Sequence, residues 1–234
     1  MTVSRGAGAG PDNVRMMDIW LVRHGETDWN RELRFQGHLD APLNDLGLQQ
    51  ARRLALHWAG HAPRALVASD LMRTRQTAQP LSEHWQQDLV PDALWREQCF
   101  GAIEGLTLAQ VQENHPDIVR GWRSHDPDFA PPGGESQRQF HARVMQAVQA
   151  LVTRCRQQGW VSPVVVSHGG VLDMIYRSAT GQALGGPRQC LIPNAGLNHV
   201  RTDGQRFEIV AWAQTGHLEG LPASAVYPMA APKA

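Results

Sequence analysis

The feature that most constrains the fold is a set of short apolar runs separated by longer segments with helical periodicity. The clearest run is Val164-Val165-Val166, and a continuous β-branched run is typical of a strand buried on both faces of a sheet. Strands are predicted at 18–23, 64–69, 163–167, 197–202 and 206–212. The last two flank Thr202-Asp203-Gly204-Gln205, which has the composition of a hairpin turn.

Helical patterns fill the intervals. We expect helices from Asn44 or Asp45 to about Ala59, and over 71–85, 107–122, 136–157 and 169–179. Because strands alternate with helices, the sequence predicts a three-layer α/β/α sandwich with a mainly parallel central sheet. The length suits one domain over 18–218, with 1–17 as a disordered extension and 219–234 as a flexible tail.

Composition excludes several classes of protein. Lys plus Arg and Asp plus Glu are both 22, so no basic excess points to nucleic acid. No apolar window is long enough for a transmembrane helix. The three cysteines, Cys99, Cys155 and Cys190, favour reduced thiols in a cytoplasmic protein over a disulfide scaffold or zinc ribbon. Cys99 is close enough to Glu97 to line a site, but we expect no catalytic role for it.

Arg23 and His24 follow the first predicted strand, where open α/β sheets bind their ligands. An imidazole can attack phosphorus and carry the group covalently, and a guanidinium can hold phosphate oxygens in a fork. Gly25 lets the backbone turn sharply. Taken alone, these residues also fit a strand end with a surface histidine.

Further motifs favour phosphoryl chemistry. They are LVRHGETDWN at 21–30, RFQGHLDAPLNDLG at 34–47, SDLMRTRQT at 69–77, Glu97 followed by FGAIEG at 100–105, PGGES at 132–136, and VVVSHGG at 164–170. In this order they resemble the histidine phosphatase superfamily, also called the phosphoglycerate mutase-like family, and the resemblance covers Asp18 to Val210.

The resemblance implies a set of active-site residues. His24 would be the nucleophile and Glu97 the general acid, with Arg23, Arg73 and His168 completing the catalytic group. Phosphate would contact Arg23, Asn30, Gln36, Gly37, Arg73 and His168, and more weakly Thr27. No metal ion or cofactor is expected if Arg23, Arg73 and His168 supply the positive field. The remaining histidines show no metal-ligand spacing and are interpreted as surface or structural residues.

Physical reasoning adds detail to these roles. His24 must attack as a neutral ring, so its second nitrogen needs an acceptor such as a nearby backbone carbonyl. Ser69 or Asp70 is predicted to cap the following helix, which places Arg73 in its first turn and points Arg75 elsewhere. His168 precedes glycines at a helix start, where free amides favour anions. Glu104 is a rival to Glu97 as the acid.

A phosphohistidine can pass its phosphoryl group to water or to a second hydroxyl. Phosphoglycerate mutases carry an inserted basic segment before the second histidine, and here that interval is short. Its arginines form no tight cluster: Arg120, Arg123, Arg138, Arg143, Arg154 and Arg156. We therefore expect a phosphomonoester hydrolase acting on a small phosphorylated metabolite. The alternatives are a cofactor-dependent phosphoglycerate mutase and a non-catalytic phosphate-binding module.

The remaining expectations concern the cover of the pocket, the tryptophans and the binding partners. The segment 106–135 is predicted to cover the pocket, with Trp122, Phe129, Pro131 and Pro132 making it partly apolar. Six tryptophans are expected in the core: Trp20, Trp58, Trp85, Trp95, Trp122 and Trp160. The expected partner is a small phosphorylated substrate, with no nucleic acid and no membrane. The oligomeric state is left open, with a homodimer as the candidate.

Overall fold

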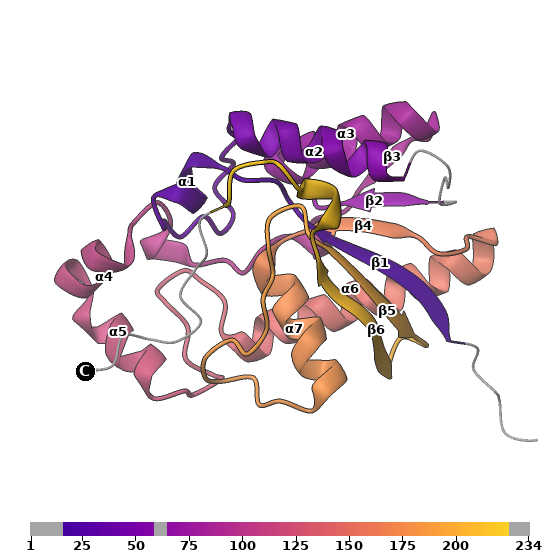
Figure 1. Cartoon of the computed structure of the whole chain (residues 1–234). Coiled ribbons are helices and arrows are strands. Elements are labelled where there is room, and N and C mark those ends of the chain that lie inside the picture. The colour runs from indigo at the N-terminus through magenta and orange to yellow at the C-terminus, as the bar shows by residue number, and fades with distance from the viewer. Residues whose placement is uncertain (1–15, 59–64, 225–234) are drawn as a thin grey trace, which may run out of the picture.

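The structure, a computed structural model, describes residues 16–58 and 65–224 and is built around a six-stranded sheet (Figure 1). The strands are β1 Met17–Arg23, β2 Leu66–Ala68, β3 Leu89–Pro91, β4 Val164–Ser167, β5 Leu197–Thr202 and β6 Phe207–Gln214. The α-helices are α1 Asp28–Arg31, α2 Asp45–His57, α3 Met72–Trp85, α4 Leu108–Asn114, α5 Pro116–Arg123, α6 Gln137–Gln158 and α7 Gly169–Thr180. All five predicted strands are therefore present.

The sheet has the order β3-β2-β4-β1-β5-β6. The pairs β3–β2, β2–β4 and β4–β1 are parallel, whereas β5 is antiparallel to both β1 and β6. The hairpin predicted between the last two strands is confirmed, with Gly204 at a φ of 103° in its turn. The expectation of a mainly parallel sheet is also confirmed.

Helices cover the sheet on both sides, which gives the predicted three layers (Figure 1). Val164 and Val166 pack with Leu54 of α2 and Leu81 of α3. Val165 points the other way and packs with residues of α6 and α7. All four residues of β4 are buried, so the β-branched run lies in the central layer as expected.

Local sequence explains where the long helices begin and end. Asn44 caps α2, because its side chain accepts from the amide of Gly47 at 2.9 Å. Ser136 and Gln139 form a capping box at the start of α6, which ends at Gly159 with a φ of 65°. The predicted end of the first long helix, at Ala59, lies outside the described residues.

The structure corrects three expectations. The helix predicted over 107–122 is two helices, α4 and α5, because Pro116 lacks the amide hydrogen that a continuous helix needs. Neither Ser69 nor Asp70 caps α3. Its N-cap is Leu71, which has no side-chain capping bond. The short edge strand β3 was not predicted.

Three hydrophobic clusters hold these layers together. The third lies under α4 and α5 and is centred on Ile103, Val111 and Ile118. Of the six tryptophans, Trp95 is fully buried and the others pack against the clusters, as expected.

The described ends of the chain pack onto the domain. Met17, predicted to close the extension, instead begins β1. Within the predicted tail, Ser224 accepts a hydrogen bond from Gln50 of α2 at 2.7 Å. Residues 1–15 and 225–234 lie outside the described part of the chain. Among the described helices, none has the length and apolar character needed to span a membrane.

Candidate active site

The sheet brings the chemically important residues together at the carboxyl ends of β1, β2 and β4. Arg23 and Ser167 are register partners, so the next residues, His24 and His168, emerge side by side with ring centroids 5.3 Å apart. Arg73 lies on the first turn of α3, just after β2, as predicted. This edge is where open α/β sheets bind their ligands.

A cavity of about 280 Å³ opens at this edge. Seven of the eight predicted site residues line it: Arg23, His24, Asn30, Gln36, Gly37, Arg73 and Glu97. The eighth, His168, is fully buried beside them. Arg75 is exposed and lies away from the cavity, as expected.

The ring of His24 is held in one tautomer. Its Nδ1 donates to the carbonyl oxygen of Gly25 at 2.7 Å, so Nε2 keeps the lone pair. Gly25 is fixed in turn, because its amide donates to Oγ1 of Thr77 at 2.9 Å. Burial lowers the pKa of His24 well below its usual range, and the charges of Arg73 and Arg23 lower it further. His24 is therefore a neutral base in a positive field.

His168 takes the opposite tautomer. Nε of Arg73 donates to its Nδ1 at 3.2 Å, so the hydrogen of the ring resides on Nε2. That nitrogen is buried and has no hydrogen-bond partner among the described residues. Burial, followed by the charge of Arg73, lowers the pKa of His168 well below its usual range. His168 is therefore a neutral donor and adds no formal charge, so the positive field comes from the arginines.

The arginines are anchored by backbone carbonyls. Arg73 is fully buried and donates to the carbonyl oxygens of Gly37 and Leu39 at 2.8 and 2.9 Å. Arg23 donates to the carbonyl oxygen of Ile192 at 2.7 Å. Each guanidinium is thus fixed before a ligand arrives, which favours electrostatic stabilisation without reorganisation.

The loop after His24 contributes polar groups. Oδ1 of Asn30 accepts from the backbone amide of Thr27 and from Nδ2 of Asn194. The side-chain nitrogen of Asn30, Nδ2, is therefore left for a ligand. Oε1 of Gln36 is buried without a hydrogen-bond partner in the described chain. Gly37 has a φ of 52°, and a Cβ there would meet the carboxylate of Glu104. Thr27 caps α1 and does not line the cavity.

Glu97 lies at the N-terminus of α7. Its Oε2 accepts from the amide of Gly170 at 3.0 Å and its Oε1 from the amide of Gln98 at 3.0 Å. A Cβ on Gly170 would stand 2.1 Å from Oε1, so only glycine lets the carboxylate approach the helix this closely. This gives a physical reason for the second glycine after His168.

Glu104 has a different environment. Its Oε1 accepts from the amides of His38 and Phe100, both at 2.9 Å, and its side chain does not line the cavity. It joins the loop around Gly37 to the segment that follows Glu97. The structure therefore places Glu97, and not Glu104, in the cavity.

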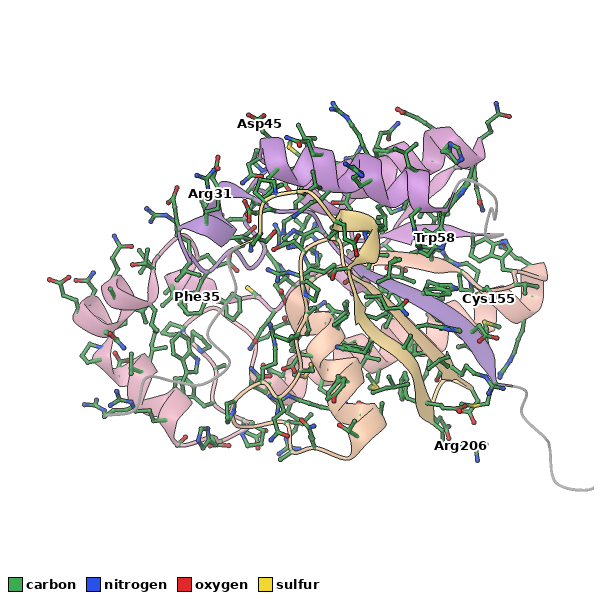
Figure 2. The ribbon with its side chains drawn as sticks, viewed as in Figure 1. Arg31, Phe35, Asp45, Trp58, Cys155 and Arg206 are labelled. Carbon is green, nitrogen blue, oxygen red and sulfur yellow. The ribbon has the colours of Figure 1, made fainter. Side chains whose placement is uncertain are left out.

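Sequence reasoning missed six of the lining side chains: Phe35, Phe100, Gln137, Asp173, Arg177 and Arg188. It expected an apolar wall from Trp122, Phe129, Pro131 and Pro132, and none of these lines the cavity. Phe35 and Phe100 form the wall, and Trp122 packs behind Phe35 with ring centroids 5.2 Å apart. Figure 2 shows Phe35 between α1 and the pair α4 and α5.

Cysteine and metal chemistry find no support in the described residues. Cys99 is not part of the cavity lining, and burial raises the pKa of its thiol. Within 16–58 and 65–224, no group of His, Cys, Asp and Glu side chains has the arrangement of a metal site.

Comparisons with known proteins agree with this geometry. A sequence model of the histidine phosphatase superfamily (branch 1) matches residues 19–215. The Arabidopsis thaliana phosphoglycerate mutase-like protein 4 is 34% identical, covering 89% of this chain and 90% of its own. The metal-independent phosphoserine phosphatase of the same plant is 32% identical, covering 87% and 84%. The structure of a mycobacterial glucosyl-3-phosphoglycerate phosphatase aligns with a TM-score of 0.72 at 29% identity, covering 86% and 100%.

Proposed function

The chain belongs to the histidine phosphatase superfamily, and from this premise we propose that it is a phosphatase that hydrolyses a small phosphomonoester through a phosphohistidine on His24. The observation that carries the proposal is the tautomer of His24. Because Nδ1 donates to Gly25, the lone pair of Nε2 is available to attack phosphorus. The ring stays neutral because its pKa is lowered by burial and by nearby arginines.

Each step balances with the residues present. Nε2 of His24 forms a bond to phosphorus, the ester P–O bond breaks, and the leaving alkoxide takes a proton from the carboxyl group of Glu97. Water then attacks phosphorus and gives a proton to Glu97, and the P–N bond breaks to release phosphate. Glu97 lines the same cavity as His24, so its carboxyl group is placed to exchange the proton in both steps.

The remaining groups stabilise charge on the transferring phosphoryl group. Arg23 and Arg73 bring two positive charges, and Nε2 of His168 brings a donor. The side-chain amide nitrogen of Asn30, the side chain of Gln36 and the backbone at Gly37 supply the other contacts to the phosphoryl group. In this mechanism the arginines perform the electrostatic work, so no metal ion is required.

We favour transfer to water over transfer to a second hydroxyl. None of the arginines between Glu97 and His168 lines the cavity, and two of them form ion pairs elsewhere: Arg143 pairs with Glu135, and Arg138 pairs with Asp128. A mutase must retain a bisphosphorylated intermediate, and these arginines do not line the cavity in which it would bind. The similarity to a protein named mutase-like keeps phosphoglycerate mutase as the second candidate. A non-catalytic binding module is the third, although every proposed catalytic residue is present.

Phosphorus NMR with 3-phosphoglycerate and a trace of 2,3-bisphosphoglycerate separates the first two functions. Growth of inorganic phosphate supports the phosphatase, whereas growth of 2-phosphoglycerate overturns it in favour of the mutase. A phosphoryl donor should also label the protein in a form that acid removes and base does not. The His24→Asn variant should lose this label, and a binding module would never acquire it.

We also infer a cytoplasmic location and propose a homodimer. The location is supported by free thiols at Cys155 and Cys190, both buried. The dimer stays a prediction, which light scattering of the purified chain tests directly.

A further inference from the structure

We propose that Arg188 forms a subsite for a carboxylate on the substrate, which would make this protein selective for phosphomonoesters that carry a second anionic group. The inference rests on the proposed function and adds a specificity-determining residue to it. Arg188 lies on the loop between α7 and β5 and lines the same cavity as His24 and Glu97. None of the sequence motifs includes it.

The loop that carries Arg188 is built around a buried ion pair. Nε of Arg177 donates to Asp173 at 3.0 Å, and both side chains are less than one-tenth exposed. The rest of the Arg177 guanidinium donates to the carbonyl oxygens of Ala183 at 2.5 Å and of Gly186 and Pro187 at 3.0 Å each. The backbone leading to Arg188 is therefore fixed before a ligand binds, and preorganisation of this kind lowers the entropic cost of binding.

The guanidinium of Arg188 has no close hydrogen-bond acceptor among the described residues. Its nearest carboxylate oxygen, on Asp173, is 3.7 Å away, beyond a good hydrogen bond. Its Nε is buried and has no hydrogen-bond partner among the described residues. Since Asp173 already pairs closely with Arg177, Arg188 is a cation beside the cavity that makes no hydrogen bond to the described residues. A planar carboxylate matches such a guanidinium in a bidentate geometry.

The position suits a group attached to the phosphorylated carbon chain. Arg188 and Arg23 flank Gly169, since a Cβ there would lie 3.5 Å from Nε of Arg23 and 3.6 and 3.7 Å from the terminal nitrogens of Arg188. Arg23 and Arg73 already match the two charges of a phosphate. A third guanidinium next to them therefore favours a substrate with one more negative charge a few bonds from the phosphate.

A matched pair of esters tests the assignment. 3-Phosphoglycerate and glycerol 3-phosphate share a three-carbon skeleton and differ only in a carboxylate or a hydroxymethyl group at the far end. The wild-type protein should favour 3-phosphoglycerate by about tenfold in kcat/KM, and Arg188→Gln should lower this ratio at least fivefold, mainly through KM. Arg188→Lys should keep part of the preference. Arg154→Gln, which removes a partly buried arginine far along α6 and outside the cavity lining, is the control and should leave the ratio unchanged.

The results separate the subsite from the proposed function. If Arg188→Gln lowers kcat/KM equally for both esters, Arg188 holds the phosphate and the carboxylate subsite is wrong; an unaltered ratio also overturns it. If the wild type hydrolyses neither ester nor p-nitrophenyl phosphate, the phosphatase proposal fails. In that case calorimetric affinities for the two esters still decide the subsite, because the same fivefold loss of preference is expected in Kd for Arg188→Gln.

Discussion

Arg73 and His168 are joined by a hydrogen bond of 3.2 Å from Nε to Nδ1, and this contact fixes the proton of His168 on its other nitrogen. His24 is fixed in the complementary sense, with its proton on Nδ1. The Nε2 atom of His24 therefore offers a lone pair and the Nε2 atom of His168 offers a donor, and neither atom has a hydrogen-bond partner among the described residues. In the proposed mechanism Arg73 therefore both binds the phosphate and orients the ring of His168.

Replacing Arg73 with Lys should lower kcat/KM by about a hundredfold or more. Lysine keeps the charge but loses the planar fork, the contacts with the carbonyls of Gly37 and Leu39, and the donor to His168. Steady-state kinetics with p-nitrophenyl phosphate measure the effect. Arg75→Lys, two residues along the same helix and exposed, is the matched control and should behave as the wild type. Equal activity in the two variants would remove Arg73 from the site.

The pH behaviour of the buried histidines gives a second prediction. The pKa values of His24 and His168 lie well below 6.5, mainly because of burial and then because of Arg73. Ring ¹⁵N shifts should therefore show both rings neutral from pH 8 to pH 6, with Nδ1 protonated in His24 and Nε2 in His168. The His24→Asn and His168→Asn variants assign the signals. A titration of His24 centred at or above pH 6.5 would contradict the structure.

The same shifts set the direction of acid sensitivity. In the unfolded chain a histidine binds its proton near pH 6.5, whereas these buried rings do so only at lower pH. Below pH 6.5 the unfolded state binds more protons, so stability falls as the pH is lowered and is fully present above that value. His217, whose pKa burial lowers to about 4, adds to the effect. The melting temperature should drop between pH 7 and pH 5, and by less in His217→Asn.

Much of this arrangement follows from local sequence. The run Val164-Val165-Val166 identified the central strand because both of its faces are covered. The motifs identified the residues at the ends of β1 and β4 because parallel strands end at one edge. The break at Pro116 was missed because the apolar periodicity continues across it, although proline itself was the available signal. The edge strand β3 is only three residues long, too short for a periodic pattern.

The cavity-lining residues that the sequence does not predict are hidden for a different reason. Arg188 reaches the cavity through the path of the loop after α7, which depends on Arg177 binding four backbone carbonyls. Nothing in the spacing of these residues encodes that path. Phe35 and Phe100 form the apolar wall because the two segments pack on each other, a contact between residues far apart in the chain. Such long-range contacts are set by the tertiary structure and lie beyond sequence periodicity.

Arg143 on α6 should act as a positioning residue for Glu97. Its guanidinium donates to the carbonyl oxygens of Leu94 at 3.0 Å, Arg96 at 2.8 Å and Glu97 at 2.9 Å, and it forms an ion pair with Glu135 at 2.6 Å. Arg143→Lys should lower kcat about tenfold on an alkyl phosphate, with a smaller change in KM. Because p-nitrophenolate leaves without help from an acid, p-nitrophenyl phosphate should be affected less. An equal loss on both esters would indicate a general structural defect.

The close approach of Glu97 to Gly170 gives the sharpest test of the acid. A methyl group at Gly170 would overlap the carboxylate, with Cβ only 2.1 Å from Oε1, so Gly170→Ala should displace Glu97 and reproduce the leaving-group dependence of Glu97→Gln. Both variants should lose about a hundredfold or more on glycerol 3-phosphate and less on p-nitrophenyl phosphate.

Two substitutions control for this prediction. A Cβ on Gly216 meets nothing within 4 Å, so Gly216→Ala should leave activity unchanged. Glu104→Gln keeps an oxygen that can accept from His38 and Phe100, so its loss should be small and equal on both esters. If Glu104→Gln instead showed the larger loss with the stronger dependence on the leaving group, Glu104 would be the acid. The contact between Glu97 and the N-terminus of α7 would then contribute to stability alone.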